Sequence, residues 1–226
     1  MTPLVAWQPL FARADFQRVA GETLRPGGLA LTRHALRLCA LPQGCLVLDL
    51  GCGRGATARL LAAQGLAVLA LDTSPEFLAE AGGPGITPLL GRAQAVPLAG
   101  GCVGAVFCEC VLSATGAAKA VLEEARRVLK PGGWLVLSDL YLRGPVEAPT
   151  QGRGDCASGA VHREALLAQL EQSGFASGLF EDHSRLLVEL AGRLILAGVP
   201  AAELGGGCAP GARPGYFLCL ARKKSA

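Results

Sequence analysis

A glycine-rich turn followed at a fixed distance by a carboxylate is the feature of this sequence best suited to chemistry. The turn is Gly51-Cys52-Gly53-Arg54-Gly55, and Asp72 follows Gly51 by 21 residues. Glycines permit a tight turn and close approach of the backbone to a ligand, and a carboxylate at the tip of the next strand accepts hydrogen bonds from both hydroxyls of a ribose. The pattern predicts a site for a ligand that carries a nucleoside.

The turn alone does not choose between two cofactors. Gly51, Gly53 and Ala56 satisfy the dinucleotide fingerprint, which accepts alanine at its third position, and Asp72 has the spacing that this fingerprint expects. A nicotinamide cofactor and S-adenosylmethionine fit equally well, and a turn that binds nothing is the structural alternative. Asp49 favours S-adenosylmethionine, because a buried carboxylate ahead of the turn can meet an ammonium group, whereas a dinucleotide site needs no charge there.

Strands and helices must alternate to hold these residues at one edge. Short apolar runs predict strands at 46–50, 67–71, 87–90, 104–110, 134–138, 175–180 and 216–221. Helical spacing and capping residues predict helices at 56–64, 75–81, 117–129, 162–172 and 185–196. This alternation predicts a parallel sheet covered on both faces, with ligands at the carboxyl ends of its strands. Residues 142–155 are expected to cross that edge as a loop.

Two segments resemble class I S-adenosylmethionine-dependent methyltransferases: residues 46–55 resemble the first motif, and the Leu-Lys-Pro-Gly-Gly-Trp run at 129–134 resembles a helix ending. The resemblance covers residues 44–140. It implies an α/β, Rossmann-like, seven-stranded and mostly parallel sheet with helices on both faces and the last strand antiparallel. We expect a single methyltransferase domain over 1–226, with a helical cap at 1–43, the cofactor-binding core at 44–140 and a substrate-side part at 141–226.

The resemblance also implies how the cofactor is held. Asp49 and the glycines would line its methionyl part, Asp72 would bind the ribose, and Ala93 would flank the adenine. The family often has an acidic residue for the adenine amino group, but here Arg92 cannot accept a hydrogen bond, which leaves the backbone or Gln94 for that task. The predicted cofactor-binding residues are Asp49, Gly51, Cys52, Gly53, Asp72, Thr73, Ala93, Gln94 and Cys108.

The methyl acceptor is expected beyond the tip of the strand at 104–110. Alternate strand residues point the same way, so Cys108 and Cys110 should share one face and Glu109 should face the other. One interpretation is a soft thiol site with a carboxylate base. The other is that small thiols fill a crowded strand and Glu109 pairs with a neighbouring cation.

Cys156 lies in a glycine-rich polar loop beside Arg153, which can stabilise a thiolate. Residues 152–160, with 166–175 after them, are similar to part of the arsenite methyltransferases, in which a cysteine of a Gly-x-Cys-x-x-Gly-Ala segment holds trivalent arsenic. A single thiol does not hold a metalloid, and Cys110 and Cys208 are the candidates for its partners. The alternative is a loop cysteine in an enzyme that acts on a small organic molecule. The candidate catalytic residues are Glu109, Cys110 and Cys156.

Composition narrows the function further. A net charge of +3, 5% aromatic residues and one terminal basic cluster argue against nucleic acid as a partner. No uncharged run reaches the roughly 20 apolar residues that a membrane-spanning helix needs. The apolar start has no basic residues before it and reads as a poor secretion signal, so we expect a cytoplasmic protein. The nine cysteines contain no Cys-x-x-Cys pair and predict reduced thiols rather than a metal site.

The sequence thus predicts S-adenosylmethionine-dependent methyl transfer to a small-molecule acceptor, with a thiol-bound metalloid such as arsenite as a narrower hypothesis. Two rivals remain open at this point. One is a nicotinamide-dependent oxidoreductase on the same sheet. The other is a non-catalytic adenosyl-binding module, which Arg92 makes more plausible.

Overall fold

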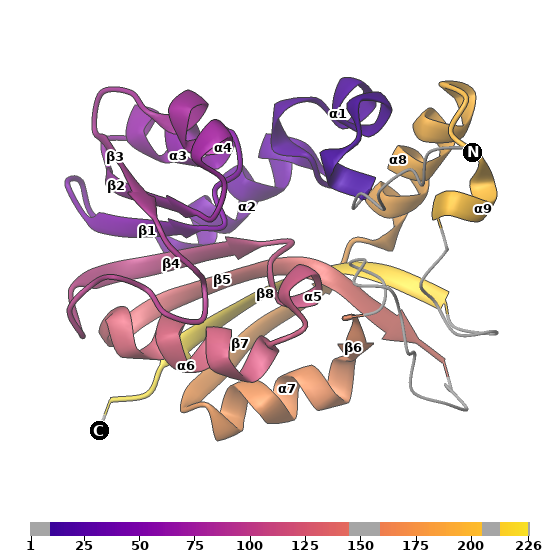
Figure 1. The fold of residues 1–226 in the computed structure, drawn as a ribbon. Coiled ribbons are helices and arrows are strands. Elements are labelled where there is room, and N and C mark those ends of the chain that lie inside the picture. The colour runs from indigo at the N-terminus through magenta and orange to yellow at the C-terminus, as the bar shows by residue number, and fades with distance from the viewer. Residues whose placement is uncertain (1–9, 145–158, 205–212, 226) are drawn as a thin grey trace, which may run out of the picture.

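A computed structural model describes residues 10–144, 159–204 and 213–225, and it shows one twisted sheet with helices on both faces (Figure 1). The strand order is β3-β2-β1-β4-β5-β8-β7, and the short β6 pairs with β5. Strands β1 to β5 pair in parallel, whereas β8 is antiparallel to both β5 and β7. The predicted mostly parallel, Rossmann-like sheet with an antiparallel last strand is confirmed; β6 is an addition.

The strands are β1 (Leu46–Leu50), β2 (Ala67–Asp72), β3 (Ile86–Leu90), β4 (Val103–Glu109), β5 (Leu129–Arg143), β6 (Val161–His162), β7 (Phe175–Asp182) and β8 (Arg213–Lys223). The helices are η1 (Leu10–Ala12), α1 (Ala14–Ala20), η2 (Gly21–Thr23), α2 (Gly28–Cys39), α3 (Ala56–Ala63), α4 (Pro75–Ala81), α5 (Leu112–Thr115), α6 (Ala118–Val128), α7 (Arg163–Gln172), α8 (Ser184–Leu196) and α9 (Ala201–Leu204). Each strand and helix expected from the sequence has a counterpart among these elements.

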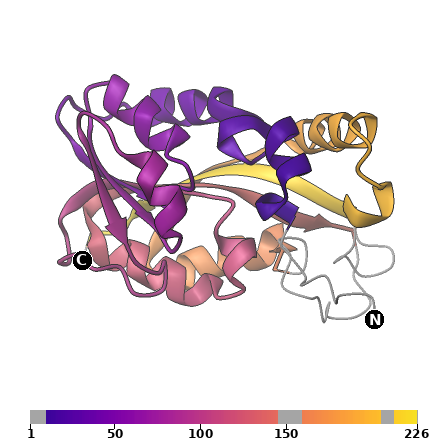
Figure 2. The same cartoon turned by 45° about the horizontal axis from the view of Figure 1, so that its top comes forward.

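Two buried apolar clusters lie on opposite faces of the sheet. Helices α6 and α7 cover one face, and α2, α3, α4 and α8 cover the other (Figure 2). Alternating residues of each strand feed the two clusters; in β1, for example, Val47 belongs to one cluster and Leu48 to the other. The sheet is therefore buried on both sides, as expected for parallel strands joined by helices.

Local signals place the elements next to the glycine turn. At the start of α4 the hydroxyl of Ser74 accepts a hydrogen bond from the Phe77 amide at 3.2 Å, and Pro75 occupies the first helical position. Strand β5 is longer than predicted, because β8 pairs with it from Trp134 to Arg143. Residues 142 and 143 of the expected loop therefore belong to β5, and residues 145–155 lie outside the described residues.

The described part of the first 43 residues contains η1, α1, η2 and α2, and the role of this region as a cap stays a prediction. Helix α1 packs on α8, and Phe16 meets Leu190, Leu194 and Val199 in a small third apolar cluster. Segments from near the two ends of the described chain therefore lie side by side over the carboxyl edge of the sheet (Figures 1 and 2).

Two of the buried cysteines hold neutral thiols. Burial raises the pKa of the thiols of Cys39 and Cys219 to about 12, so these side chains behave as small neutral hydrophobes.

Within the described ranges, every helix is too short or too polar to cross a membrane.

Candidate functional site

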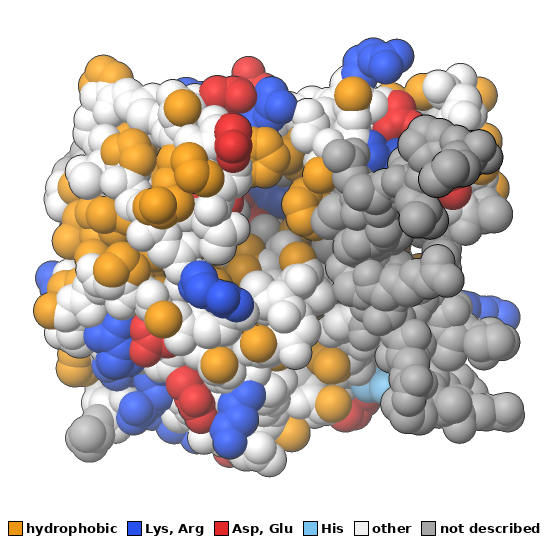
Figure 3. Space-filling model, viewed as in Figure 1, with side chains coloured by type: hydrophobic (Ala, Val, Ile, Leu, Met, Phe, Trp, Pro, Cys, Tyr) orange, Lys and Arg blue, Asp and Glu red, His pale blue; other side chains and the backbone are white. Residues whose placement is uncertain are grey.

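A cavity of about 750 Å³ opens at the carboxyl edge of the sheet. Figure 3 shows the surface hollowed between the glycine turn and the α1 side of the molecule, with hydrophobic side chains along part of the rim. One wall of the cavity lies at the carboxyl ends of β1, β2 and β3, and we call it the sheet-edge half. It is formed by Asp49, Gly51, Cys52, Gly53, Asp72, Thr73, Arg92, Ala93 and Gln94. We call its opposite wall the helical half, formed by Leu10, Phe11, Phe16, Glu22, Leu24, Leu187, Leu190, Glu203 and Leu204.

The structure brings eight of the nine predicted cofactor residues onto the sheet-edge half. The ninth, Cys108, lies apart from them, 1% exposed in the apolar cluster on the α6 face. Its predicted contact with a cofactor gains no support from this position. The sequence places Cys108 in the strand, but it does not show which strand residues border the cavity.

Gly51 and Gly53 serve different purposes in the glycine turn. Gly51 has φ 74°, and a Cβ there would lie 2.5 Å from Val111, so this glycine permits close packing. Gly53 has φ 53° and open space where its Cβ would be. The amides of Gly51 and Cys52 both donate to the Leu71 carbonyl, at 2.8 and 2.9 Å, which joins the turn to β2. Gly53 therefore presents its backbone to the cavity without a side chain.

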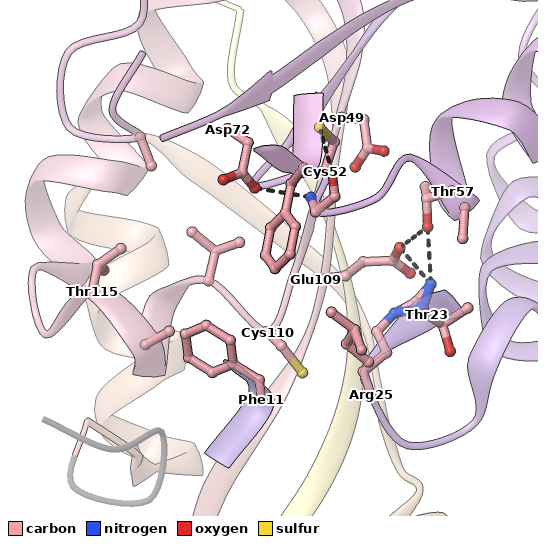
Figure 4. Close-up of a pocket in the computed structure, with 18 of the residues that line it drawn as sticks. Phe11, Thr23, Arg25, Asp49, Cys52, Thr57, Asp72, Glu109, Cys110 and Thr115 are labelled. Carbon is pink, nitrogen blue, oxygen red and sulfur yellow. Dashed lines mark hydrogen bonds and ion pairs between the residues drawn. The ribbon is translucent and has the colours of Figure 1, made fainter. Parts of the chain in front are cut away.

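Asp72 is held by the turn that it faces. Its Oδ2 accepts the Gly53 amide at 2.9 Å, and its Oδ1 accepts the Ser74 amide at 2.9 Å. Each carboxylate oxygen has capacity for a further hydrogen bond. Asp72 is thus a fixed double acceptor on the cavity wall (Figure 4).

Asp49 is buried, with 2% of its surface exposed, and its Oδ2 has no hydrogen-bond partner among the described residues. Burial, and next the like charge of Glu109, raise the pKa of its carboxyl to about 8. The neutral acid therefore predominates at pH 7 in the protein as described. A buried acceptor without a partner beside a cavity suits a cationic group of a ligand.

A buried ion pair divides the two halves. Arg25, from the segment before α2, places its Nη2 2.6 Å from Oε2 of Glu109, and the two side chains are 4% and 5% exposed. The hydroxyl of Thr57 donates to Oε2 of Glu109 at 2.7 Å (Figure 4). The hydroxyl of Thr32 donates to Oε1 of Glu109 at 3.0 Å. Both oxygens are thus engaged, which is the cation pairing that the sequence offered as an alternative to a base. A catalytic role for Glu109 stays a prediction.

Sequence reasoning missed Arg25. Its Nε is buried and has no hydrogen-bond partner among the described residues, while its Nη2 contacts Glu109, Thr57 and Thr32. The available signal was a pair of threonines, Thr32 and Thr57, on helix faces that are otherwise apolar. Buried hydroxyls imply polar partners, although the sequence does not name them.

Cys110 lines the cavity, and Figure 4 shows its sulfur directed into it. The Sγ lies 3.3 Å from the hydroxyl of Tyr216, which in turn donates to Ser138 at 3.2 Å. The expectation that Cys108 and Cys110 share one face is wrong. Strand β4 ends at Glu109 and Cys110 has φ 58°, so the alternation stops and Cys110 packs against the cluster on the α2 face.

The other predicted residues line the cavity or lie outside the described residues. Ala93 is buried at 6% exposure, and Arg92 and Gln94 line the cavity beside it. Cys156 and Cys208 lie outside the described residues. Within the described residues, no three His, Cys, Asp or Glu side chains are grouped so as to hold a metal ion.

The comparisons with known proteins agree with this geometry. Residues 48–137 match the family model described as a methyltransferase domain. An arsenite methyltransferase of Halobacterium salinarum is 30% identical over 151 residues, which cover 60% of this chain and 38% of that protein. The chain spans less than half the length of the first curated relatives that it matches.

Two solved structures share the fold. A phosphoethanolamine N-methyltransferase 2 of Haemonchus contortus, in complex with phosphomonomethylethanolamine and S-adenosylhomocysteine, has a TM-score of 0.73 at 19% identity, covering 93% of this chain and 56% of that one. The (4+2)-cyclase SpnF has a TM-score of 0.72 at 21% identity, covering 87% and 82%. The region that carries the glycine turn therefore matches a methyltransferase domain, and the sheet has the fold of these two solved structures.

Proposed function

We propose that this protein binds S-adenosylmethionine in the sheet-edge half and transfers its methyl group to a small-molecule acceptor in the rest of the cavity. The observation that carries the proposal is the placement of two acids, Asp49 and Asp72, on one wall beside the bare backbone of Gly53. A pyrophosphate would meet two acidic groups there, whereas an adenosyl amino acid offers an ammonium group and two hydroxyls. The match to a methyltransferase family model supports the same choice.

The donor set fits each part of the cofactor. Among the described residues, Oδ2 of Asp49 and Nε of Arg25 have no hydrogen-bond partner. The first suits the ammonium group of S-adenosylmethionine and the second suits its carboxylate. Asp72 has acceptor capacity for the ribose hydroxyls. Ala93 and Gln94 supply an apolar surface and an amide for the adenine. In this proposal Glu109 holds Arg25 in position and does not act as a base.

When bound, S-adenosylmethionine supplies a methyl carbon on a positively charged sulfur. In methyl transfer a lone pair of the acceptor forms a bond to that carbon while the carbon–sulfur bond breaks and its electron pair stays on sulfur. The protein's part is to align the acceptor opposite the leaving sulfur and to exclude water. Cys110, between the two halves, borders the place where the acceptor must lie.

Isothermal titration of the purified protein with S-adenosylhomocysteine and with NADH tests this proposal. We expect S-adenosylhomocysteine to bind and NADH to give no heat of binding. Binding of NADH alone would favour the oxidoreductase. Binding of neither would favour a module that keeps the fold for another purpose.

A trivalent metalloid is the second candidate for the acceptor. Two observations favour it: the Halobacterium salinarum relative is an arsenite methyltransferase, and the thiol of Cys110 lines the cavity. Thiolates are the ligands that soft ions prefer. If arsenite is the acceptor, Cys110→Ser and Cys156→Ser should each abolish arsenite-dependent consumption of the methyl donor while the affinity for S-adenosylhomocysteine is kept. Unchanged turnover in both variants would reject the metalloid.

A further inference from the structure

The helical half of the cavity is apolar over most of its surface. Its apolar side chains come from η1, α1, α8 and α9, which are separate in sequence and converge on this wall (Figure 1). Most of them belong to the small third cluster that joins α1 to α8, whereas Leu187 packs against the cluster on the α2 face. They include Phe11, Phe16, Leu187, Leu190 and Leu204.

The charged groups of the helical half are neutralised by partners. Glu22 pairs with Arg59 at 3.1 Å, and Glu203 pairs with Arg13. At the boundary, Arg25 is compensated by Glu109. Among the described residues of this wall, each carboxylate therefore has a cation within ion-pair distance, and a charged acceptor would find no unmatched opposite charge.

The size of the cavity leaves room for a second molecule. Small-molecule sites generally measure about 300–1,000 Å³, and this cavity of about 750 Å³ lies in the upper part of that range. The polar groups suited to an adenosyl amino acid are confined to the sheet-edge half and the boundary. The remaining space is bordered mostly by apolar side chains, and its polar residues are Glu22, Thr23, Thr115 and Glu203.

We infer that the methyl acceptor is an uncharged, carbon-rich molecule whose apolar body lies in the helical half and whose nucleophilic end reaches the boundary near Cys110. This inference rests on the proposed function. Burial of an apolar body against this wall removes apolar surface from water on both sides, which stabilises the complex. A small hydrophilic acceptor such as arsenite would leave the same wall in contact with water.

The experiment measures binding of N-phenyl-1-naphthylamine, an uncharged apolar fluorescent probe, in the presence of saturating S-adenosylhomocysteine. A series of straight-chain alcohols from hexanol to decanol then displaces the probe. Each added methylene that enters the cavity should tighten displacement about fourfold, since a buried methylene contributes about 0.8 kcal/mol. Arsenite should not displace the probe.

Variants on α8 locate the site. Leu187 lines the cavity, whereas the next residue, Val188, is 66% exposed and does not. We expect Leu187→Gln to weaken probe binding roughly tenfold because it places an amide on the apolar wall. Leu187→Met and Val188→Gln should stay within about twofold of the parent protein.

The outcomes separate this inference from the proposed function. Probe binding that ignores alcohol chain length, that is equally sensitive to changes at Leu187 and Val188, or that S-adenosylhomocysteine displaces would overturn the apolar acceptor. Binding of S-adenosylhomocysteine in those same samples would leave the proposed function standing. Probe binding that follows the expected pattern without any S-adenosylhomocysteine binding would support the apolar site and reject the cofactor.

Discussion

In the sheet-edge half of the cavity, Asp49 and Asp72 form no ion pair with any described residue, whereas in the helical half the carboxylates of Glu22 and Glu203 are both paired. The first wall therefore has polar capacity left over, and the second has almost none. Unsatisfied buried polar groups are rare in folded proteins and call for an explanation. A ligand with a cationic group and hydroxyls would provide one on the first wall, and an uncharged apolar ligand matches the second.

The largest expected effect concerns the boundary between the halves. Glu109→Gln leaves the buried guanidinium of Arg25 without its countercharge, so we expect the free energy of unfolding to fall by about 3–5 kcal/mol. Urea denaturation at pH 7 measures this change. The double variant Arg25→Met/Glu109→Gln should recover much of the loss. A single-variant loss below about 1 kcal/mol would mean that the boundary behaves as an exposed pair.

Next in size is the loss of Asp72 from the sheet-edge half. Asp72→Ala removes a charged acceptor from the ribose position, so affinity for S-adenosylhomocysteine should fall by about 3 kcal/mol, or roughly 100-fold. Isothermal titration measures this. Glu123→Gln, an exposed carboxylate on α6 outside the cavity, is the control and should bind as the parent does. If the probe also stops binding to Asp72→Ala, the two halves are not independent.

The buried carboxyl of Asp49 should make the free energy of unfolding depend on pH. Because its pKa is raised from 3.8 to about 8, the folded protein holds a proton that the unfolded chain has released between these values. The free energy of unfolding should therefore decline as pH rises through this window, by roughly 2 kcal/mol from pH 5 to pH 7 from this group alone. Urea denaturation across the range should show a shallower decline for Asp49→Asn. An identical decline in both proteins would contradict the assignment.

A smaller effect links the same carboxyl to the ligand. An ammonium group beside Asp49 favours the ionised carboxylate, so binding of S-adenosylhomocysteine at pH 7 should release a fraction of a proton. The affinity should rise by up to about 1.4 kcal/mol per pH unit between pH 6 and pH 8. Titration calorimetry in buffers of different ionisation enthalpy counts the proton. Equal proton release by Asp49→Asn would place the ammonium group elsewhere.

Much of the sheet-edge half could be predicted from the sequence because its determinants are local. The glycine turn and Asp72 belong to adjacent elements, and parallel pairing of β1 with β2 brings their carboxyl ends together. The positive φ values of the glycines follow from residue type. Short apolar runs predicted β1, β2 and β4, and the helical spacing of apolar residues predicted α6.

The helical half and the boundary could not be predicted in the same way. Arg25 and Glu109 are 84 residues apart, and no periodicity relates them. The face to which Cys110 points depends on its own left-handed backbone conformation, with φ 58°. Cysteine seldom adopts this conformation, and the sequence pattern of a strand does not indicate it. The full length of β5 depended on pairing with β8, a contact between distant parts of the chain.

Residues 10–24 and 187–204 build one wall of the cavity, while residues 49–94 build the opposite wall. Contacts between segments so distant in sequence form after local ones, since long loops must close first. We therefore expect β1, α3 and β2 around the glycine turn to form before the wall that meets them. Substitutions in the end segments would therefore change the helical half of the cavity without altering the hydrogen bonds between Asp72 and the glycine turn.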